Sequence, residues 1–218
     1  MKQTARVMLR LAHYSTCCAL ALPLLLAGCA SQTRNPAPGN ATSVLPTRTY
    51  SEAIDIDGRF SVELRRHDKT EVWNGNFSWT QSAQGATVTL QSPLGQTLAM
   101  IAVNGATATL TQSGKPQRSA ANVDALAEEA LGWPLPISDL HDWLQAYVVT
   151  ADGKRIMATP QSTAMIVTRD GWHIVFTSWQ KDDEIGARDV PKRIDMERDT
   201  VEAGKVLMRL VITSWQPR

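Results

Sequence analysis

The chain contains little cysteine. Three cysteines occur in 218 residues, and all of them lie within the first 29 positions. Residues 30–218 can therefore form no disulfide, and their fold must depend on a hydrophobic core. A segment of that length is long enough to bury a sizeable core as one domain.

The N-terminus lacks an apolar run long enough to cross a membrane. The apolar stretch Cys17–Ala27 is interrupted by Pro23 and falls well short of the roughly 20 residues that a spanning helix needs. It follows a basic segment that contains Lys2 and Arg6, and this order is typical of a secretory signal peptide. We therefore expect residues 1–28 to be a signal peptide that is removed.

The end of the signal and the residue after it read Leu26-Ala27-Gly28-Cys29, which resembles the bacterial lipobox. The resemblance implies diacylglyceryl transfer to the Cys29 thiol, cleavage before Cys29 and acylation of the new N-terminus. Stable anchoring takes at least two hydrophobic signals, and a di- or triacylated Cys29 supplies them alone. We expect this covalent acyl lipid and no cofactor. The alternative is an ordinary cleaved signal with a cysteine nearby.

The segment after the cleavage point, residues 29–50, is polar, rich in proline and without periodicity. Such a composition is typical of a flexible tether, and about 20 residues span roughly 25 Å. Ala30 and Ser31 follow the cysteine, which by similarity to enterobacterial sorting rules implies export to the outer membrane. We expect the domain formed by residues 51–218 to be lipid-anchored there and to face the periplasm.

The charge balance excludes one class of partner. The formal net charge is +1, and removal of the basic signal peptide leaves a slight acidic excess. No basic surface suited to a nucleic acid remains. Mixed runs such as 181–184 are typical of solvated loops.

The motifs of common enzymes are missing as well. The sequence has no Gly-x-Ser-x-Gly elbow, no His-Glu-x-x-His metal motif and no Gly-x-x-x-x-Gly-Lys-Ser/Thr phosphate loop. The four histidines are scattered. In the most suggestive pair, His141 and Asp142, adjacent helical side chains point about 100° apart. We expect no catalytic residue and no metal site.

From Gly58 onward the sequence has a period of two. Phe60, Val62 and Leu64 alternate with polar residues, which is typical of half-buried antiparallel strands. Similar segments recur to the end of the chain, and Asn104-Gly105 suits a two-residue hairpin turn. We expect a mainly β domain built on a single curved antiparallel sheet of about ten or eleven strands.

Two amphipathic helices interrupt this pattern. Asn122 suits the N-cap of the first helix and Gly132 its end, while Ser138 is expected to cap the second. Their apolar faces are expected to cover the concave face of the sheet as a lid. The lid residues are Leu126 in the first helix and Leu140, Trp143 and Leu144 in the second.

A strongly curved sheet capped by helices encloses an apolar space unless large side chains fill it. The candidates for lining such a cavity are large apolar residues of the expected strands: Trp73, Phe77, Trp79, Met100, Trp172, Phe176 and Met208. The alternative is that each is an ordinary core residue. Periodicity does not distinguish a filled core from a ligand cavity.

The connection Gln91–Gln96 joins two expected strands. Pro93 and Gly95 favour a turn, so Leu94 should lie near its tip, where a leucine has little to pack against. We interpret Pro93, Leu94 and Gly95 as a membrane-insertion loop that touches a bilayer or an acyl chain. The alternative is a leucine folded back under its own loop.

Short motifs along the domain match one known family in order. They are the lipobox, Gly58-Arg59-Phe60, Phe77-Ser78-Trp79, Ser92-Pro93-Leu94-Gly95, Leu131-Gly132-Trp133-Pro134-Leu135-Pro136, Leu140-His141-Asp142-Trp143-Leu144 and Ile212-Thr213-Ser214-Trp215. Together they resemble the LolB family of outer-membrane lipoprotein receptors. The resemblance implies an open, incomplete β-barrel with helices as a lid over a hydrophobic cavity. It also places the family's protruding hydrophobic loop on Leu94.

The resemblance further implies a function. Members of this family accept lipoproteins, by their acyl chains, from the soluble periplasmic carrier LolA and insert them into the inner leaflet of the outer membrane. The expected partners are LolA, the acyl chains of client lipoproteins and outer-membrane phospholipid, and the expected state is a monomer. The sequence leaves one alternative open, a structural or assembly-partner lipoprotein of the same shape without acyl-chain transfer.

Overall fold

The computed structural model describes residues 50–66, 69–182 and 188–218. The signal peptide, Cys29 and most of the expected tether therefore lie outside the described residues. Among the described residues, no helix is both long and apolar enough to span a membrane.

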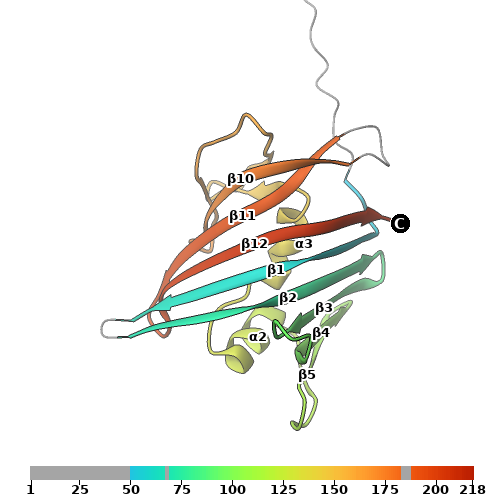
Figure 1. Ribbon diagram of the computed structural model, residues 1–218, viewed down its shortest axis with the longest axis vertical. Helices are drawn as coiled ribbons and strands as arrows, with labels where there is room; N and C mark the ends of the chain where they lie inside the picture. Colours follow the sequence, from blue (N-terminus) through green and yellow to red (C-terminus); the bar gives the residue numbers. More distant parts are fainter. Residues whose placement is uncertain (1–49, 67–68, 183–187) are drawn as a thin grey trace, which may run out of the picture. The chain divides into compact units, whose positions relative to one another are not determined.

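In the described part of the chain, ten strands form one antiparallel sheet in the order β6-β5-β4-β3-β2-β1-β12-β11-β10-β9. Figure 1 shows the sheet with its two ends apart, so it is not closed into a barrel. This confirms the expected open antiparallel sheet. The strands are β1 (Ile54–Arg65), β2 (Thr70–Ser82), β3 (Gly85–Gln91), β4 (Thr97–Asn104), β5 (Thr107–Thr111), β6 (Arg118–Ala120), β9 (Ile166–Val167), β10 (His173–Asp182), β11 (Arg188–Thr200) and β12 (Gly204–Pro217).

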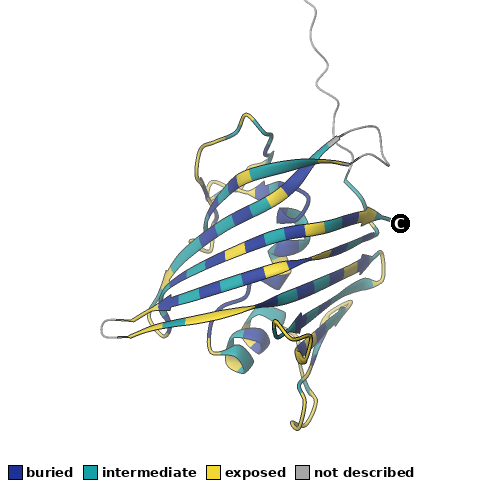
Figure 2. Ribbon diagram, in the orientation of Figure 1, coloured by how far each residue is buried: buried dark blue, intermediate teal, exposed yellow. Residues whose placement is uncertain are grey.

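The long strand β1 lies at the centre of the sheet. It pairs with β2 and with β12 from Ile54 to Arg65, so its whole length is hydrogen-bonded on both sides. Its alternate residues Ile54, Ile56, Phe60, Val62 and Leu64 are buried. This alternation gives the sheet a buried inner face and a solvent-exposed outer face, as the banding in Figure 2 shows.

Helices α2 (Val123–Leu131) and α3 (Ile137–Trp143) cover the inner face, behind the sheet in Figure 1. The Asn122 side chain accepts a hydrogen bond from the Ala125 amide, and Gly132 ends α2 in the left-handed conformation at φ 79°. Both expectations for α2 are confirmed. A small second sheet, β7 (Tyr147–Val149) and β8 (Arg155–Met157), follows α3.

The expectation that Ser138 caps α3 is wrong. The helix begins at Ile137, directly after Pro136, and makes no hydrogen bond to a capping side chain of its own. Instead, Asp124 of α2 accepts hydrogen bonds from the Ser138 amide, at 3.0 Å, and from the Ser138 hydroxyl. A tertiary contact therefore satisfies an amide of the first turn that a local cap would otherwise satisfy.

Candidate functional site

The space between the sheet and the helices is entirely apolar and nearly filled. Its free volume is about 20 Å³, which is room for about one water-sized group. Strands β1, β2, β3 and β12 form one wall, and α3 and the link before it form the other. The lining residues are Phe60, Val62, Phe77, Trp79, Val88, Leu90, Trp133, Leu135, Leu140, Leu144, Met208 and Leu210.

Three of the seven residues expected to line a cavity do so: Phe77, Trp79 and Met208. Trp172 and Phe176 are buried elsewhere in the core. The Trp172 ring packs edge-on against Trp143 at 6.3 Å between centroids, and Phe176 packs against Trp179 at 5.7 Å.

The expectation for Met100 is wrong. Its strand neighbours Ala99 and Ile101 point into the core, so Met100 points outward and is 43% exposed. Because residues 97–103 are apolar at almost every position, their pattern does not reveal which alternate set faces inward.

The expectation for Trp73 also needs correction. Trp73 pairs with the buried Val62, so it lies on the inner side of the sheet, but 48% of it is exposed. Figure 2 shows the corresponding half of β2 largely exposed. The lid does not cover this end of the strand, so Trp73 lies outside the apolar space.

All four lid residues are buried. Leu140 and Leu144 line the apolar space directly, while Leu126 and Trp143 lie in the surrounding core. Trp133 and Leu135 also line this space, although the sequence did not indicate it. They lie in a proline-containing link that has no periodicity, and only the folded packing shows that their side chains point inward.

The first described residues are fastened to the end of the lid. The buried Gln145 side chain accepts a hydrogen bond from the Ser51 amide at 2.8 Å and donates one to the Ser51 carbonyl at 3.1 Å. The Arg155 guanidinium lies over the rings of Tyr50 and Tyr147 at 5.3 and 4.8 Å. The lid and the start of the domain therefore share one set of contacts.

Leu94 lies at the tip of the turn between β3 and β4 and is 91% exposed. The Gly95 amide donates to the Ser92 carbonyl at 2.9 Å, and the Ser92 amide donates to the Gln96 carbonyl at 2.8 Å. Gly95 has φ 83°, a conformation that glycine adopts without strain. The backbone of the turn thus presents Leu94 to the surroundings.

Another apolar residue that is almost fully exposed was not expected from the sequence. Val201 is 96% exposed in the turn between β11 and β12. Its sequence gave no signal, because it stands among the polar residues Asp199, Thr200 and Glu202. Leu94, by contrast, stands between the turn-forming residues Pro93 and Gly95.

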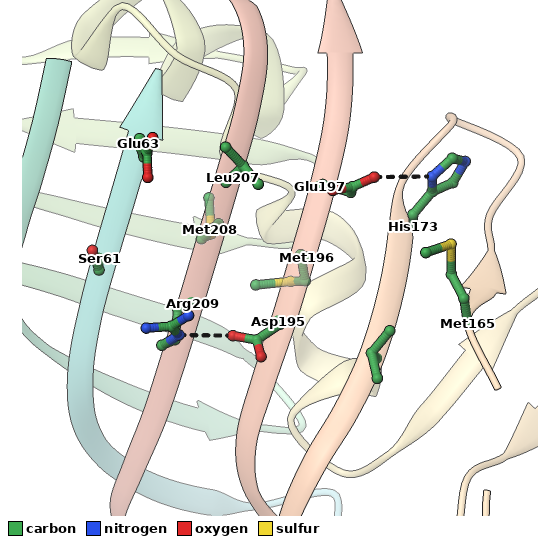
Figure 3. Close-up of a pocket in the computed structure, with 11 residues that line it drawn as sticks. Ser61, Glu63, Met165, His173, Asp195, Met196, Glu197, Leu207, Met208 and Arg209 are labelled. Atoms are coloured by element: carbon green, nitrogen blue, oxygen red, sulfur yellow. Dashed lines mark hydrogen bonds and ion pairs between the residues drawn. The ribbon is translucent and has the colours of Figure 1, made fainter. Parts of the chain in front are cut away.

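The outer face of β12, β11 and β10 carries paired charges around a hollow of about 190 Å³. Figure 3 shows Arg209 directed at Asp195 and Glu197 directed at His173. Burial acts to raise the pKa of the Asp195 carboxyl, but hydrogen bonds and charges from Arg193 and Arg209 outweigh it and lower the pKa. Arg193 and Arg209 thus both pair with the Asp195 carboxylate on this surface.

A separate acidic hollow of about 290 Å³ lies beside the lid. Burial raises the pKa of Asp139 above its ordinary value, and the neighbouring carboxylates Asp170 and Asp124 raise it further. His141 and Asp142 lie 3.6 Å apart, and Asp142 pairs with Arg155 at 2.8 Å. The Asp142 carboxylate is therefore engaged by a cation.

The family model described as "Outer membrane lipoprotein LolB" matches residues 52–215. The chain belongs to the LolB family. It is 34% identical to the outer-membrane lipoprotein LolB of Cupriavidus taiwanensis over 207 residues, which cover 91% of this chain and 95% of that protein. It is 26% identical to the LolB of Pseudomonas aeruginosa, over 89% of this chain and 92% of that protein.

The solved structures that resemble this fold include a LolA superfamily protein from Nitrosomonas europaea, with 9% identity and a TM-score of 0.46 over 78% of this chain and 88% of that one. Membership of the LolB family makes this protein an outer-membrane lipoprotein that serves lipoprotein localisation as a receptor. The LolB motifs also coincide with the geometry described above, because they include the link that lines the apolar space and the turn that presents Leu94.

Proposed function

We propose that this protein accepts the acyl chains of lipoproteins from the periplasmic carrier LolA and inserts them into the inner leaflet of the outer membrane. The observation that carries the proposal is an apolar space under a two-helix lid on a domain that also presents an exposed leucine at a turn. Acyl chains need the first feature, and a bilayer contact needs the second.

The proposal requires the lid to move. A free volume of about 20 Å³ holds no acyl chain, so α3 and the link before it must shift away from β2 and β3 for a chain to enter. The chain then replaces apolar contacts that the lid makes in the closed state. Each buried methylene contributes about 0.8 kcal/mol, so a long chain can compensate for the contacts that are lost.

Transfer needs no nucleotide if the acyl chains are bound more tightly at each successive step. The chains pass from the carrier to this protein if its opened interior binds them more tightly, and they leave it if the bilayer holds them more tightly still. Leu94 acts at the last step, where an apolar side chain contacts the leaflet and guides the chains out of the domain.

The anchor is part of the proposal. Acyl chains on Cys29 hold the protein in the outer membrane, and residues 29–50 let a monomeric domain reach into the periplasm toward the carrier. The fastening of Ser51 to Gln145 supports this arrangement, because it fixes where the tether leaves the domain.

One observation favours the alternative of a structural lipoprotein. The interior is packed almost as tightly as an ordinary core, which is what a scaffold without acyl-chain transfer would show. The two functions predict different behaviour of the lid and of Leu94, and an experiment can separate them.

The test uses the chain from residue 30 onward, mixed without ATP with carrier that holds a radiolabelled triacylated lipoprotein. We expect label to move to this protein and then to liposomes. A Leu94→Glu variant should accept label but fail to deliver it. The matched control is Val201→Glu, which alters an equally exposed apolar residue in another turn. Absence of transfer to the unaltered chain would leave the structural function in its place.

A further inference from the structure

The outer face of the sheet is divided into an uncharged half and a charged half. From Val72 to Gly114 the chain contains no Asp, Glu, Lys, Arg or His, although charged residues make up 20% of the whole sequence. This stretch forms most of β2 and all of β3, β4 and β5. The strands β12, β11 and β10 carry the Arg209–Asp195 ion pair and the His173–Glu197 contact drawn in Figure 3. The Lys205–Glu197 ion pair lies on the same strands.

The uncharged half exposes apolar and threonine side chains in register. Met100 pairs with Thr89 on one side and Thr111 on the other, and Ala102 pairs with Thr87 and Thr109. Leu98 is 39% exposed on the same side of β4 as Met100. An outer face without charge costs less free energy to remove from water than a charged one, because no ionised group has to be desolvated.

The Leu94 turn lies on this same side of the sheet. Pro93 lines a hollow of about 550 Å³ together with the outward-pointing residues Arg59, Asn74 and Asn76. The Asn76 amide also donates a hydrogen bond to the Ser92 carbonyl at 3.4 Å. The turn is thus held against the outer face, on the side of the sheet opposite to the lid.

The border of the uncharged face carries a cation suited to lipid phosphate. The outward charges of β1, the strand next to β2, are Asp55, Asp57, Arg59, Glu63 and Arg65. Arg59 pairs across the sheet with Asn76. Among the described residues, no carboxylate lies within ion-pair distance of Arg59, whereas Arg209 and Arg193 share Asp195. Phospholipid phosphates would complement the charge of Arg59 beside the Leu94 turn.

We infer that the outer face of β3, β4 and β5 lies against the phospholipid bilayer and that the Leu94 turn is its leading edge. This inference rests on the proposed function, which brings Leu94 alone into contact with the leaflet. It adds a surface that fixes the orientation of the domain, with Leu98 and Met100 at the bilayer interface and the lid turned away from it.

Single nitroxide labels test this arrangement. The protein is processed in cells and reconstituted into vesicles of phosphatidylethanolamine and phosphatidylglycerol. The variants Leu94→Cys, Met100→Cys and Met165→Cys each supply one thiol, since the thiol of Cys29 carries lipid in the proposed mature form. Met165 is the matched control, a methionine that is 53% exposed just before β9 at the opposite edge of the sheet. Unaltered protein should take up no label.

We expect the labels at 94 and 100 to lose accessibility to an aqueous nickel chelate and gain it to oxygen, while the label at 165 stays in water. A label at 100 that stays in water while 94 is buried overturns this inference and leaves the proposed action of Leu94 intact. If neither 94 nor 100 is buried, both fail. Protection of 100 by the carrier rather than by lipid assigns the face to a protein partner and also overturns the inference.

Discussion

Asp124 on α2 holds the start of α3, because its carboxylate accepts hydrogen bonds from both the amide and the hydroxyl of Ser138. The contact joins α2 and α3 across the link that lines the apolar space. The helices are therefore coupled through a side-chain contact as well as through the chain.

Replacing Asp124 by alanine should loosen this coupling. The variant loses both hydrogen bonds to Ser138, and we expect the free energy of unfolding to fall by about 1–2 kcal/mol, in the range of a lost helix cap. Amide exchange in α3 should rise more than exchange in β1. Denaturant titration and hydrogen exchange measure the two effects. Glu128→Ala on the same helix is the control, and equal effects from both variants would contradict the prediction.

The fastening between Gln145 and Ser51 predicts a second effect. Gln145→Ala removes both hydrogen bonds to the Ser51 backbone and should cost about 1–3 kcal/mol, because the partly buried amide and carbonyl of Ser51 lose their partner. Protease cleavage near residue 50 should become faster. Gln161→Ala, at an exposed position, should change neither property. Unaltered cleavage in Gln145→Ala would show that other contacts fix the start of the domain.

Gly75 of β2 lies close to the Gln91 carbonyl and to the Phe60 ring, near the start of the Leu94 turn. A Cβ there would lie 2.1 Å from the Gln91 carbonyl oxygen and 2.7 Å from the Phe60 ring. Gly75→Ala must therefore displace backbone at the end of β3, and we expect a loss of about 1–3 kcal/mol in thermal or denaturant unfolding. Asn74→Ala, at the exposed neighbouring position, should stay within about 0.5 kcal/mol of the unaltered protein.

Asp139 predicts a pH dependence. Its pKa is raised in the folded protein, so the folded state holds the proton more tightly than the unfolded state does. Stability contributed by this group is present below the ordinary carboxyl pKa and is lost as the pH rises through the raised value. Asp139→Asn should therefore be more stable than the unaltered protein at pH 7, and the difference should vanish below about pH 4. Urea unfolding across that range measures it, with the exposed Glu202→Gln as the control. A difference that grows toward low pH would contradict the assignment.

Local chain chemistry predicted some features well and failed at others for a physical reason. The exposure of Leu94 follows from a proline and a glycine on either side of it, so it could be predicted from three residues. The end of α2 at Gly132 follows in the same way. Ser138 was misassigned because the group that satisfies its amide comes from another helix, which no local pattern reveals.

The cavity residues show where alternation stops being informative. Phe77 and Trp79 alternate with polar neighbours, and their inward direction was predicted correctly. Met208 also faces inward, although its neighbour Leu207 is apolar. Met100 lies in a strand that is apolar on both faces. The sequence pattern therefore does not show whether the Met100 side chain points toward the lid or away from it. The side of Trp73 was predicted correctly but its burial was not, because the extent of the lid along β2 is a property of the packed fold.

The pairing of β1 on both sides has a mechanical consequence. This strand begins four residues after Tyr50, where the proposed tether meets the domain, and both of its ladders run from Ile54 to Arg65. A pull on the membrane anchor along the strand would load the two rows of hydrogen bonds in parallel, so that no single bond carries the force. The anchored domain would then withstand a pulling force from a moving membrane or a docked partner without unfolding.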